Sequence, residues 1–193
     1  MVKLTPPFRI AVEADAMNLA ELVNFAGEGL PFHIWSGLAR NGENPWTIGR
    51  DRQAEKVRDG QVIVMDVGEG VIAALTGYVI GPDPEPIGSD FPALFRPLQE
   101  LENEALQSWY INVLACYPDH RGKGYGTRLM QVAEDICRSI GLLRLCLIVA
   151  SNNTDAWRLY ERLGYVRASS RRCVRNGWET DTECWDLMIK TLQ

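Results

Sequence analysis

The sequence predicts an α+β fold in which helices flank a mixed sheet of six or seven strands. Two strand-like runs, 62–67 and 71–80, are separated by a Gly-Glu-Gly turn, which is typical of an antiparallel hairpin. Further along, strand-like segments 109–116 and 143–149 enclose a helical pattern at 124–140. Strand, helix and strand in this order form a βαβ unit, whose two strands run parallel. Antiparallel and parallel pairs are therefore both expected.

The N-terminal part opens as a strand followed by a helix. Residues 8–12 alternate weakly between apolar and polar side chains. Asp15 then precedes a run with apolar residues at helical spacing, which Gly27 ends. The next segment, 28–59, mixes turn residues with aromatic ones, and we expect it to hold one or two short helices.

The second half contains an insertion and a closing pair of strands. Three prolines in 81–88 break the chain, and 91–106 is expected to be a short helical insert rich in Leu and Glu. A helical pattern at 153–163 ends at Gly164. The closing strands are expected at 165–170 and 184–189, around a turn at Asn176-Gly177.

Length and charge exclude several classes of protein. The 193 residues suit a single domain, 1–193, that carries a loop and helix insert at 81–106. Twenty Lys and Arg against 25 Asp and Glu give a formal net charge of −5. The chain thus lacks the overall positive field that draws proteins onto nucleic acid or anionic lipid. We expect neither nucleic acid nor a membrane as a partner.

The cysteines and histidines suit a reducing compartment without a metal. Five scattered cysteines form no CxxC pair, and the only histidines are His33 and His120. No segment approaches 18 uninterrupted apolar residues. These features predict a cytoplasmic protein with no metal site.

The sharpest motif is Arg121-Gly122-Lys123-Gly124-Tyr125-Gly126, after a strand and at the start of a helix. Glycines let the backbone turn tightly, and the amides of the loop and of the first helical turn, with the helix dipole, favour a phosphate. Arg121, Lys123 and Arg128 add positive charge. The spacing fits neither GxGxxG nor GxxxxGK. The motif is therefore interpreted as holding a phosphorylated ligand; the alternative is a glycine turn with solvated charges.

The pattern Arg121-x-x-Gly124-x-Gly126 resembles the coenzyme A pyrophosphate loop of the GNAT superfamily of acyl-CoA-dependent N-acetyltransferases. The family's other signature is matched by Asn153-x-x-Ala156-x-x-Leu159-Tyr160-x-x-Leu163-Gly164-Tyr165, behind the expected strand. Leu114-x-Cys116-x-Pro118 also fits, although the family more often has Val at the position of Cys116. The close match covers about 109–166.

The resemblance implies the family's fold, a mostly antiparallel mixed sheet whose central parallel strands splay apart to admit a pantetheine arm. It implies acetyl-CoA as cosubstrate and main-chain pairing of Leu114 and Cys116 with that arm, the Leu114 amide polarising the thioester carbonyl. Amides from Gly122 to Thr127 would hold the diphosphate, Asn153 would bond to the pantetheine side, and Tyr160 would face the sulfur. The implied coenzyme-binding residues are Leu114, Cys116, Arg121, Gly122, Lys123, Gly124, Tyr125, Gly126, Thr127, Asn153, Ala156 and Tyr160.

Tyr160 is the implied general acid, and its chemistry suits that role. A phenol with a pKa of about 10 stays protonated at neutral pH. It can donate its proton to a departing thiolate, for which the cysteine pKa of about 8.5 is the reference. Taken alone, a Tyr on an apolar helix stripe is more often a core aromatic; the surrounding motif favours the catalytic interpretation.

The acceptor amine needs a base or a water path, because an alkylammonium with a pKa near 10 must lose a proton before it attacks. Histone-type members of the family place a Glu where this chain has Tyr110. The enzymes that acetylate ribosomal proteins place their base where Ile148 stands. Both usual positions are thus empty. The remaining candidates for the base are Glu28, His33, Glu102 and Glu104, with solvated surface charges as the alternative.

The resemblance implies transfer of an acetyl group to a primary amine by direct attack in a ternary complex. A small-molecule amine is the first choice of acceptor, because the insert and the aromatic segment 32–46 could wall off a compact pocket. Acetylation of a protein amino terminus or lysine is the alternative. A non-catalytic acyl-CoA sensor is a third interpretation, and a homodimer is common in the family.

Overall fold

The computed structural model describes residues 2–60 and 62–193, which form two compact units. The first unit holds 2–77 and 113–130, and the second holds 78–112 and 131–193. The expectation of a single domain stays a prediction.

Within the described residues, seven strands make a mixed sheet and confirm the predicted fold class. They hydrogen-bond in the order β1-β2-β3-β4-β5-β7-β6. Strands β4 and β5 are parallel, with registered pairs from Trp109 to Ile111, whereas β7 is antiparallel to both β5 and β6. The strands are β1 (Phe8–Ile10), β2 (Val62–Asp66), β3 (Val71–Ile80), β4 (Ser108–Cys116), β5 (Arg144–Ala150), β6 (Val166–Arg172) and β7 (Cys184–Thr191).

The predicted hairpin between β2 and β3 is confirmed. The two strands are antiparallel, and the turn between them places Gly68 and Gly70 at φ 99° and 109°. These angles lie in the left-handed region, which glycine adopts without steric cost. The side chain of Asp66 accepts a hydrogen bond from the Gly68 amide at 2.9 Å and fixes the turn.

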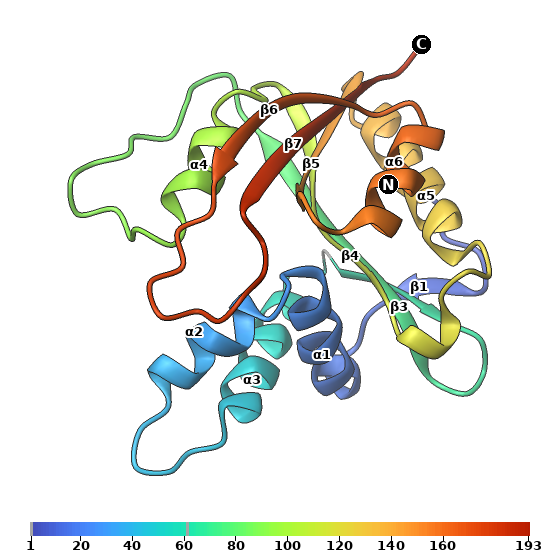
Figure 1. The fold of residues 1–193 in the computed structure, drawn as a ribbon. Helices are drawn as coiled ribbons and strands as arrows, with labels where there is room; N and C mark the ends of the chain where they lie inside the picture. The colour runs from blue at the N-terminus through green and yellow to red at the C-terminus, as the bar shows by residue number, and fades with distance from the viewer. Residues whose placement is uncertain (1, 61) are drawn as a thin grey trace. The chain divides into compact units, whose positions relative to one another are not determined.

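Three helices, α1 (Ala16–Ala26), α2 (Leu30–Leu38) and α3 (Pro45–Arg58), lie side by side in the first unit (Figure 1). A single 3₁₀ turn, Glu13–Asp15, precedes α1. Leu19 and Leu22 of α1 are buried in one apolar cluster with strand residues that include Val64 and Val113. The predicted one or two short helices in 28–59 are α2 and a longer α3.

Aromatic packing explains why the 28–59 segment is ordered. The Trp46 ring lies 4.9 Å from Phe32 and 5.8 Å from Trp35, so the aromatic side chains join α2 to α3. Asn44 caps α3 by accepting a hydrogen bond from the Trp46 amide at 3.0 Å. Trp35 is buried, and it therefore serves packing in this unit.

The second unit contains α4 (Arg96–Glu102), α6 (Thr154–Arg162) and most of α5 (Tyr125–Ser139), which begins in the first unit. Helix α4 lies beside β6 and β7 (Figure 1). The helical part of the insert is shorter than the predicted 91–106. It stops where Asn103 turns its side chain to the backbone of Glu85, with bonds of 2.9 and 2.8 Å that hold the proline-rich loop.

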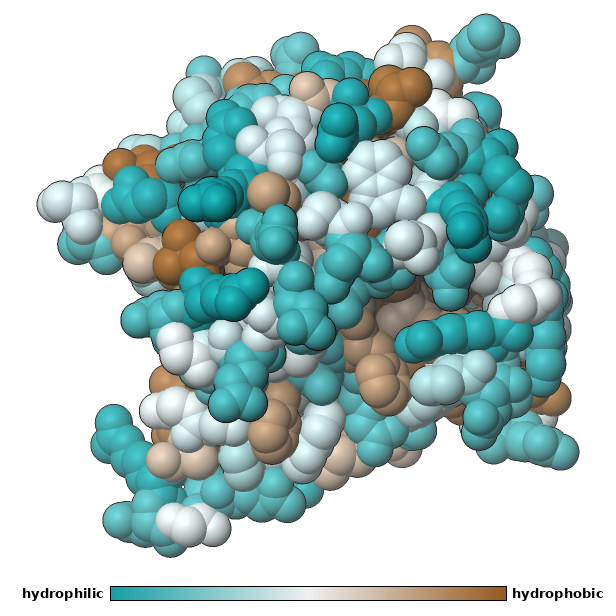
Figure 2. Space-filling model, viewed as in Figure 1, coloured by the Kyte–Doolittle hydropathy of each residue, from teal (hydrophilic) through white to brown (hydrophobic). Residues whose placement is uncertain are grey.

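Polar side chains cover most of the face drawn in Figure 2, with apolar residues scattered among them. Scattered apolar side chains are normal on protein surfaces. Over the part of the chain that the structure describes, no helix is both long and apolar enough to cross a membrane.

Candidate functional site

The glycine loop, residues 121–126, lies in the first unit, where it follows β4 and runs into the first turn of α5. A 3₁₀ turn, Pro118–His120, leads into it. Gly122 and Gly124 have φ values of 73° and 80°, and a Cβ built on either would meet nothing within 4 Å. The glycines are therefore needed for the backbone conformation itself rather than for space.

The amides at the start of α5 lie where a helix can attract an anion. The first turn of any α-helix carries N–H groups without a partner inside the helix, at the positive end of the helix dipole. The Arg128 amide donates to the Gly124 carbonyl at 3.2 Å, and the Arg121 amide donates to Pro118 at 3.1 Å. The amides between them, from Gly122 to Thr127, are those that the family resemblance assigns to the diphosphate.

Two arginines beside the loop are held by aromatic rings. The Arg121 guanidinium lies 5.9 Å from the Phe25 ring, and its Nε donates to the Cys116 carbonyl at 3.2 Å. The Arg128 guanidinium lies 5.1 Å from the Phe8 ring. Both distances suit cation–π interactions. Sequence analysis missed Phe8 and Phe25, because these contacts join residues about a hundred positions apart.

Tyr117 ties the entry of the loop to α1. Its hydroxyl donates to the Glu21 carboxylate and accepts a hydrogen bond from Asn18 at 3.1 Å. Its amide donates to the Ile72 carbonyl at 3.0 Å. Burial, helped by the bond to Glu21, raises the pKa of Tyr117 to about 12, so its hydroxyl stays a donor at neutral pH. The loop therefore starts from a fixed point on the sheet.

Leu114 and Cys116, the predicted main-chain contacts, are both half-buried on β4. Burial raises the pKa of the Cys116 thiol, although Arg121 and Lys123 act in the opposite direction. A thiol of raised pKa holds little thiolate at neutral pH, and thiolate is the reactive form. The residue is thus poorly suited to act as a nucleophile, and direct attack, which the family resemblance implies, needs no such nucleophile.

The second signature lies in the second unit, where Asn153 is the N-cap of α6. Its side-chain oxygen accepts a hydrogen bond from the Ala156 amide at 3.2 Å, so the structure brings these two predicted residues together. Asn is a preferred residue at the start of a helix, so capping of α6 is sufficient to explain why Asn stands at this position. The predicted bond from Asn153 to pantetheine stays a prediction.

Tyr160 is buried on α6, with 7% of its surface exposed. Its ring lies 6.0 Å from that of Tyr165, whose amide donates to the Tyr160 carbonyl at 3.0 Å. The Tyr165 hydroxyl is buried and has no hydrogen-bond partner among the described residues. The two neighbouring tyrosines thus allow Tyr160 to be compared with a tyrosine whose hydroxyl has no hydrogen-bond partner among the described residues.

The four base candidates have different surroundings. Glu28 and His33 belong to the first unit, around the connection from α1 to α2. In the second unit, Glu104 forms an ion pair with Arg171 of β6. Glu102 instead accepts a hydrogen bond from the Tyr78 hydroxyl at 2.8 Å. Across residues 2–60 and 62–193, no three His, Cys, Asp or Glu side chains gather as a metal site.

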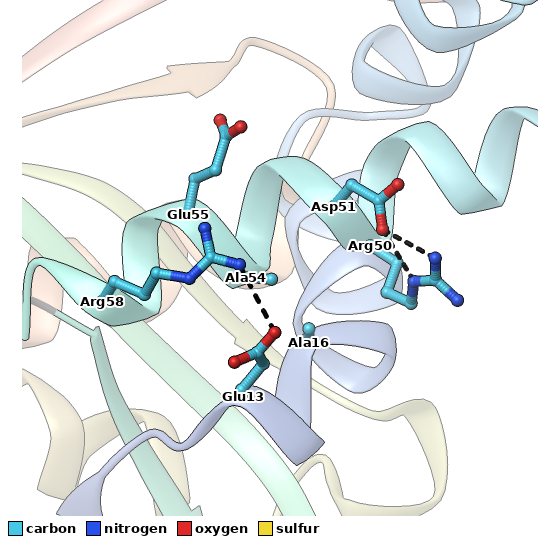
Figure 3. Close-up of a pocket in the computed structure, with 7 residues that line it drawn as sticks. All are labelled: Glu13, Ala16, Arg50, Asp51, Ala54, Glu55 and Arg58. Atoms are coloured by element: carbon cyan, nitrogen blue, oxygen red, sulfur yellow. Dashed lines mark hydrogen bonds and ion pairs between the residues drawn. The ribbon is translucent and has the colours of Figure 1, made fainter.

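A pocket of about 230 Å³ lies between the start of α1 and helix α3, within the first unit (Figure 3). Its charged lining is largely paired: Arg58 lies 3.4 Å from Glu13, and Arg50 lies 2.7 Å from Asp51. Glu55 points away from the Glu13–Arg58 pair (Figure 3). The pocket contains none of the residues that the motifs single out, so we do not assign the chemistry to it.

Comparison with known proteins agrees with the motifs. Residues 33–165 match the model of the acetyltransferase (GNAT) family. The chain is 28% identical over 149 residues to N-alpha-acetyltransferase 40 of Saccharomyces cerevisiae. This alignment covers 72% of this chain and 48% of that protein. The chain spans about half or less of the length of the curated relatives that it matches.

Solved structures share the fold over nearly the whole chain. Mosquito arylalkylamine N-acetyltransferase like 5b has a TM-score of 0.66 at 19% identity, covering 96% of this chain and 99% of that one. The yncA protein of Salmonella typhimurium, solved with its cofactor acetyl-CoA, has a TM-score of 0.63 at 19% identity, covering 100% and 95%. Together with the family match over more than half of its length, this shared fold identifies the chain as a member of the GNAT acetyltransferase family.

Proposed function

We propose that this protein transfers the acetyl group of acetyl-CoA to a primary amine, with the glycine loop binding the diphosphate of the coenzyme. The observation that carries the proposal is the loop itself. Left-handed Gly122 and Gly124 lead into the first turn of α5, with Arg121, Lys123 and Arg128 beside it. Amide donors, a helix dipole and cations at one place suit a diphosphate. The family supplies the acetyl-CoA chemistry.

Tyr160 is the proposed general acid, and Leu114 supplies the amide that polarises the thioester carbonyl. A phenol in a buried position can protonate the departing thiolate without competition from bulk water. Positioning of the two substrates and the polarised carbonyl would supply most of the rate. Coenzyme binding by Cys116, Asn153 and Ala156 remains part of the same proposal.

A small-molecule amine is the first acceptor that we propose. The insert supports a cationic acceptor, because 81–106 holds six carboxylates and one arginine, and among the described residues four of the six remain after Arg171 pairs with Glu100 and Glu104. A negative field attracts an alkylammonium. A protein amino terminus is the second candidate, favoured by the relative named N-alpha-acetyltransferase 40.

Release of free thiol from acetyl-CoA tests the activity. The panel of acceptors contains spermidine, tyramine, an aminoglycoside, free amino acids and short peptides with a free amino terminus. We expect turnover with at least one of them. Binding of acetyl-CoA without turnover on any of these amines would overturn the enzymatic proposal and support a sensor.

Substitution of the two neighbouring tyrosines tests the role of Tyr160. Tyr160→Phe should lower kcat at least about tenfold while acetyl-CoA still binds, because the proton donor is lost. Tyr165→Phe is the matched control, since the hydroxyl that it removes has no partner among the described residues. Equal kcat values for the two variants would remove Tyr160 from the mechanism.

A further inference from the structure

Glu102 lies in a small group of side chains at the end of α4, within the second unit. The Tyr78 hydroxyl of β3 donates to Glu102 Oε2 at 2.8 Å. The Tyr78 ring in turn packs edge-on against Tyr110 of β4, with centroids 5.1 Å apart and an angle of 60°. Tyr78, which lies 24 residues before Glu102 in the sequence, thus contacts both the carboxylate and the Tyr110 ring. We call Tyr78, Glu102 and Tyr110 the Glu102 cluster.

The surroundings of Glu102 differ from those of its acidic neighbours. Glu100 and Glu104 both pair with Arg171 of β6, Glu100 at 3.2 Å. Among the described residues, no cation pairs with Glu102. Its hydrogen-bond donor, Tyr78, is 39% exposed, so a molecule from solvent can approach this side of the cluster. A carboxylate that is held in place but not neutralised can take up a proton.

The titratable groups around Glu102 also set its behaviour. Burial raises the pKa of the Glu102 carboxyl, and the hydrogen bond from Tyr78 lowers it. Tyr110 of β4 and Cys146 of β5 face it as neutral groups, since burial raises the pKa of both. Burial is the main cause of the raised pKa of Tyr110, and electrostatic interactions with Glu102 and with the Tyr160 phenol add to it. Tyr110 is therefore within electrostatic reach of the carboxylate and of the proposed general acid.

We propose that Glu102 is the general base that accepts the proton of the acceptor ammonium, with Tyr78 as the residue that positions it. This inference rests on the proposed acetyl transfer. The structure favours Glu102 over Glu104, whose carboxylate is paired with Arg171.

The proposed reaction moves two protons from the acceptor nitrogen. One N–H bond of the ammonium breaks, its proton passes to the Glu102 carboxylate, and the neutral amine attacks the thioester carbon. The C–S bond then breaks, and the thiolate takes the Tyr160 proton. The second nitrogen proton, lost as the amide forms, restores Tyr160. Glu102 returns its proton to solvent.

The test compares glutamine variants along one helix, using whichever amine of the panel the wild type acetylates. Glu102→Gln should lower kcat at least about tenfold, as expected for loss of a general base, with an unchanged Kd for acetyl-CoA. Glu100→Gln, the control on the same helix, should keep kcat. A base works only when ionised, so the wild-type rate should fall at low pH, and this fall should disappear in Glu102→Gln.

Tyr78→Phe separates positioning from folding. It removes the bond that lowers the pKa of Glu102, so the acidic limb of the rate profile should move to higher pH; a merely structural role would leave the limb in place. An unchanged kcat and pH profile in Glu102→Gln would overturn the proposal, as would a loss of the limb in Glu104→Gln instead. If the wild type turns over no amine, the proposed function fails and this inference fails with it. If the wild type is active and Glu102→Gln and Tyr78→Phe have the same kcat and pH profile as the wild type, the inference alone fails.

Discussion

The glycine loop and the Glu102 cluster, for which we propose different roles, are built from different parts of the chain. The loop offers main-chain amides of consecutive residues, and two glycines at positive φ set their direction. The cluster offers side chains from β3, α4 and β4, and it exists only when these segments pack. A site made of local backbone depends on conformation at single residues, whereas an assembled site depends on the identity of a few side chains.

Gly124→Ala should produce the largest change, because it alters the direction of the amides. An Ala at φ 80° is strained by about 1–2 kcal/mol, and the loop relieves this by moving. Each charge-assisted hydrogen bond is worth about 1.5–3 kcal/mol, so the Kd for acetyl-CoA should rise about 10- to 100-fold. Isothermal titration calorimetry measures it.

Gly141→Ala is the control for backbone strain. Gly141 has a φ of 78°, and a Cβ there also meets nothing within 4 Å, but the residue lies after α5. Both variants should lose similar stability, and only Gly124→Ala should lose affinity. A similar loss of affinity in both would mean that the loop conformation has no special part in binding.

Asp15→Asn tests whether a side-chain network of the first unit, like the Glu102 cluster of the second, depends on the identity of a single side chain. Asp15 accepts two bonds from Arg9, one of them 2.6 Å long, and Arg9 also reaches Asp66. This network lies in the first unit but is assembled from separate segments, like the Glu102 cluster. Loss of the charged partner should lower the free energy of unfolding by about 2 kcal/mol at pH 7. Urea unfolding measures the change.

The difference in unfolding free energy between wild type and Asp15→Asn depends on pH with a definite sign. The guanidinium of Arg9 is the largest influence that holds the pKa of Asp15 below its usual value. The stabilisation is therefore complete above pH 4 or so and declines as the pH falls through the folded-state pKa. The difference between wild type and Asp15→Asn should shrink in acid. Asp51→Asn, at a surface pair with 61% exposure, should change stability by less than about 0.5 kcal/mol at either pH.

The sequence predicts local features of this molecule well and assembled ones poorly. The hairpin at Gly68 to Gly70 and the glycine loop follow from residues that are neighbours in the chain. The length of α3 does not, because it depends on Trp46 packing against Trp35 and Phe32. The helical part of the insert is shorter than predicted, because the Asn103 side chain bonds to the backbone of Glu85.

The same distinction applies to the candidate site. Motif spacing singles out Gly122, Gly124 and Tyr160 without knowledge of the fold. Among the acidic candidates, sequence reasoning could not separate Glu102 from Glu104, two positions apart. The partners that separate them, Tyr78 and Arg171, are 24 and 67 residues away. Only packing reveals them.

Phe25→Leu should have the smallest effect on coenzyme binding, because it changes a side chain of α1 that packs beside the glycine loop and leaves the loop's own backbone unchanged. Phe25 packs against both Tyr117 and Arg121, and leucine keeps the apolar bulk while removing the ring. A cation–π contact at an exposed site is worth about 0.5–1 kcal/mol, so the Kd for acetyl-CoA should rise about two- to fivefold. Phe95→Leu, at a phenylalanine of similar exposure in the second unit, is the control and should leave the Kd unchanged. A rise as large as that of Gly124→Ala would show that the loop depends on its side-chain support as strongly as on its own backbone, and the contrast between the two kinds of site would not hold.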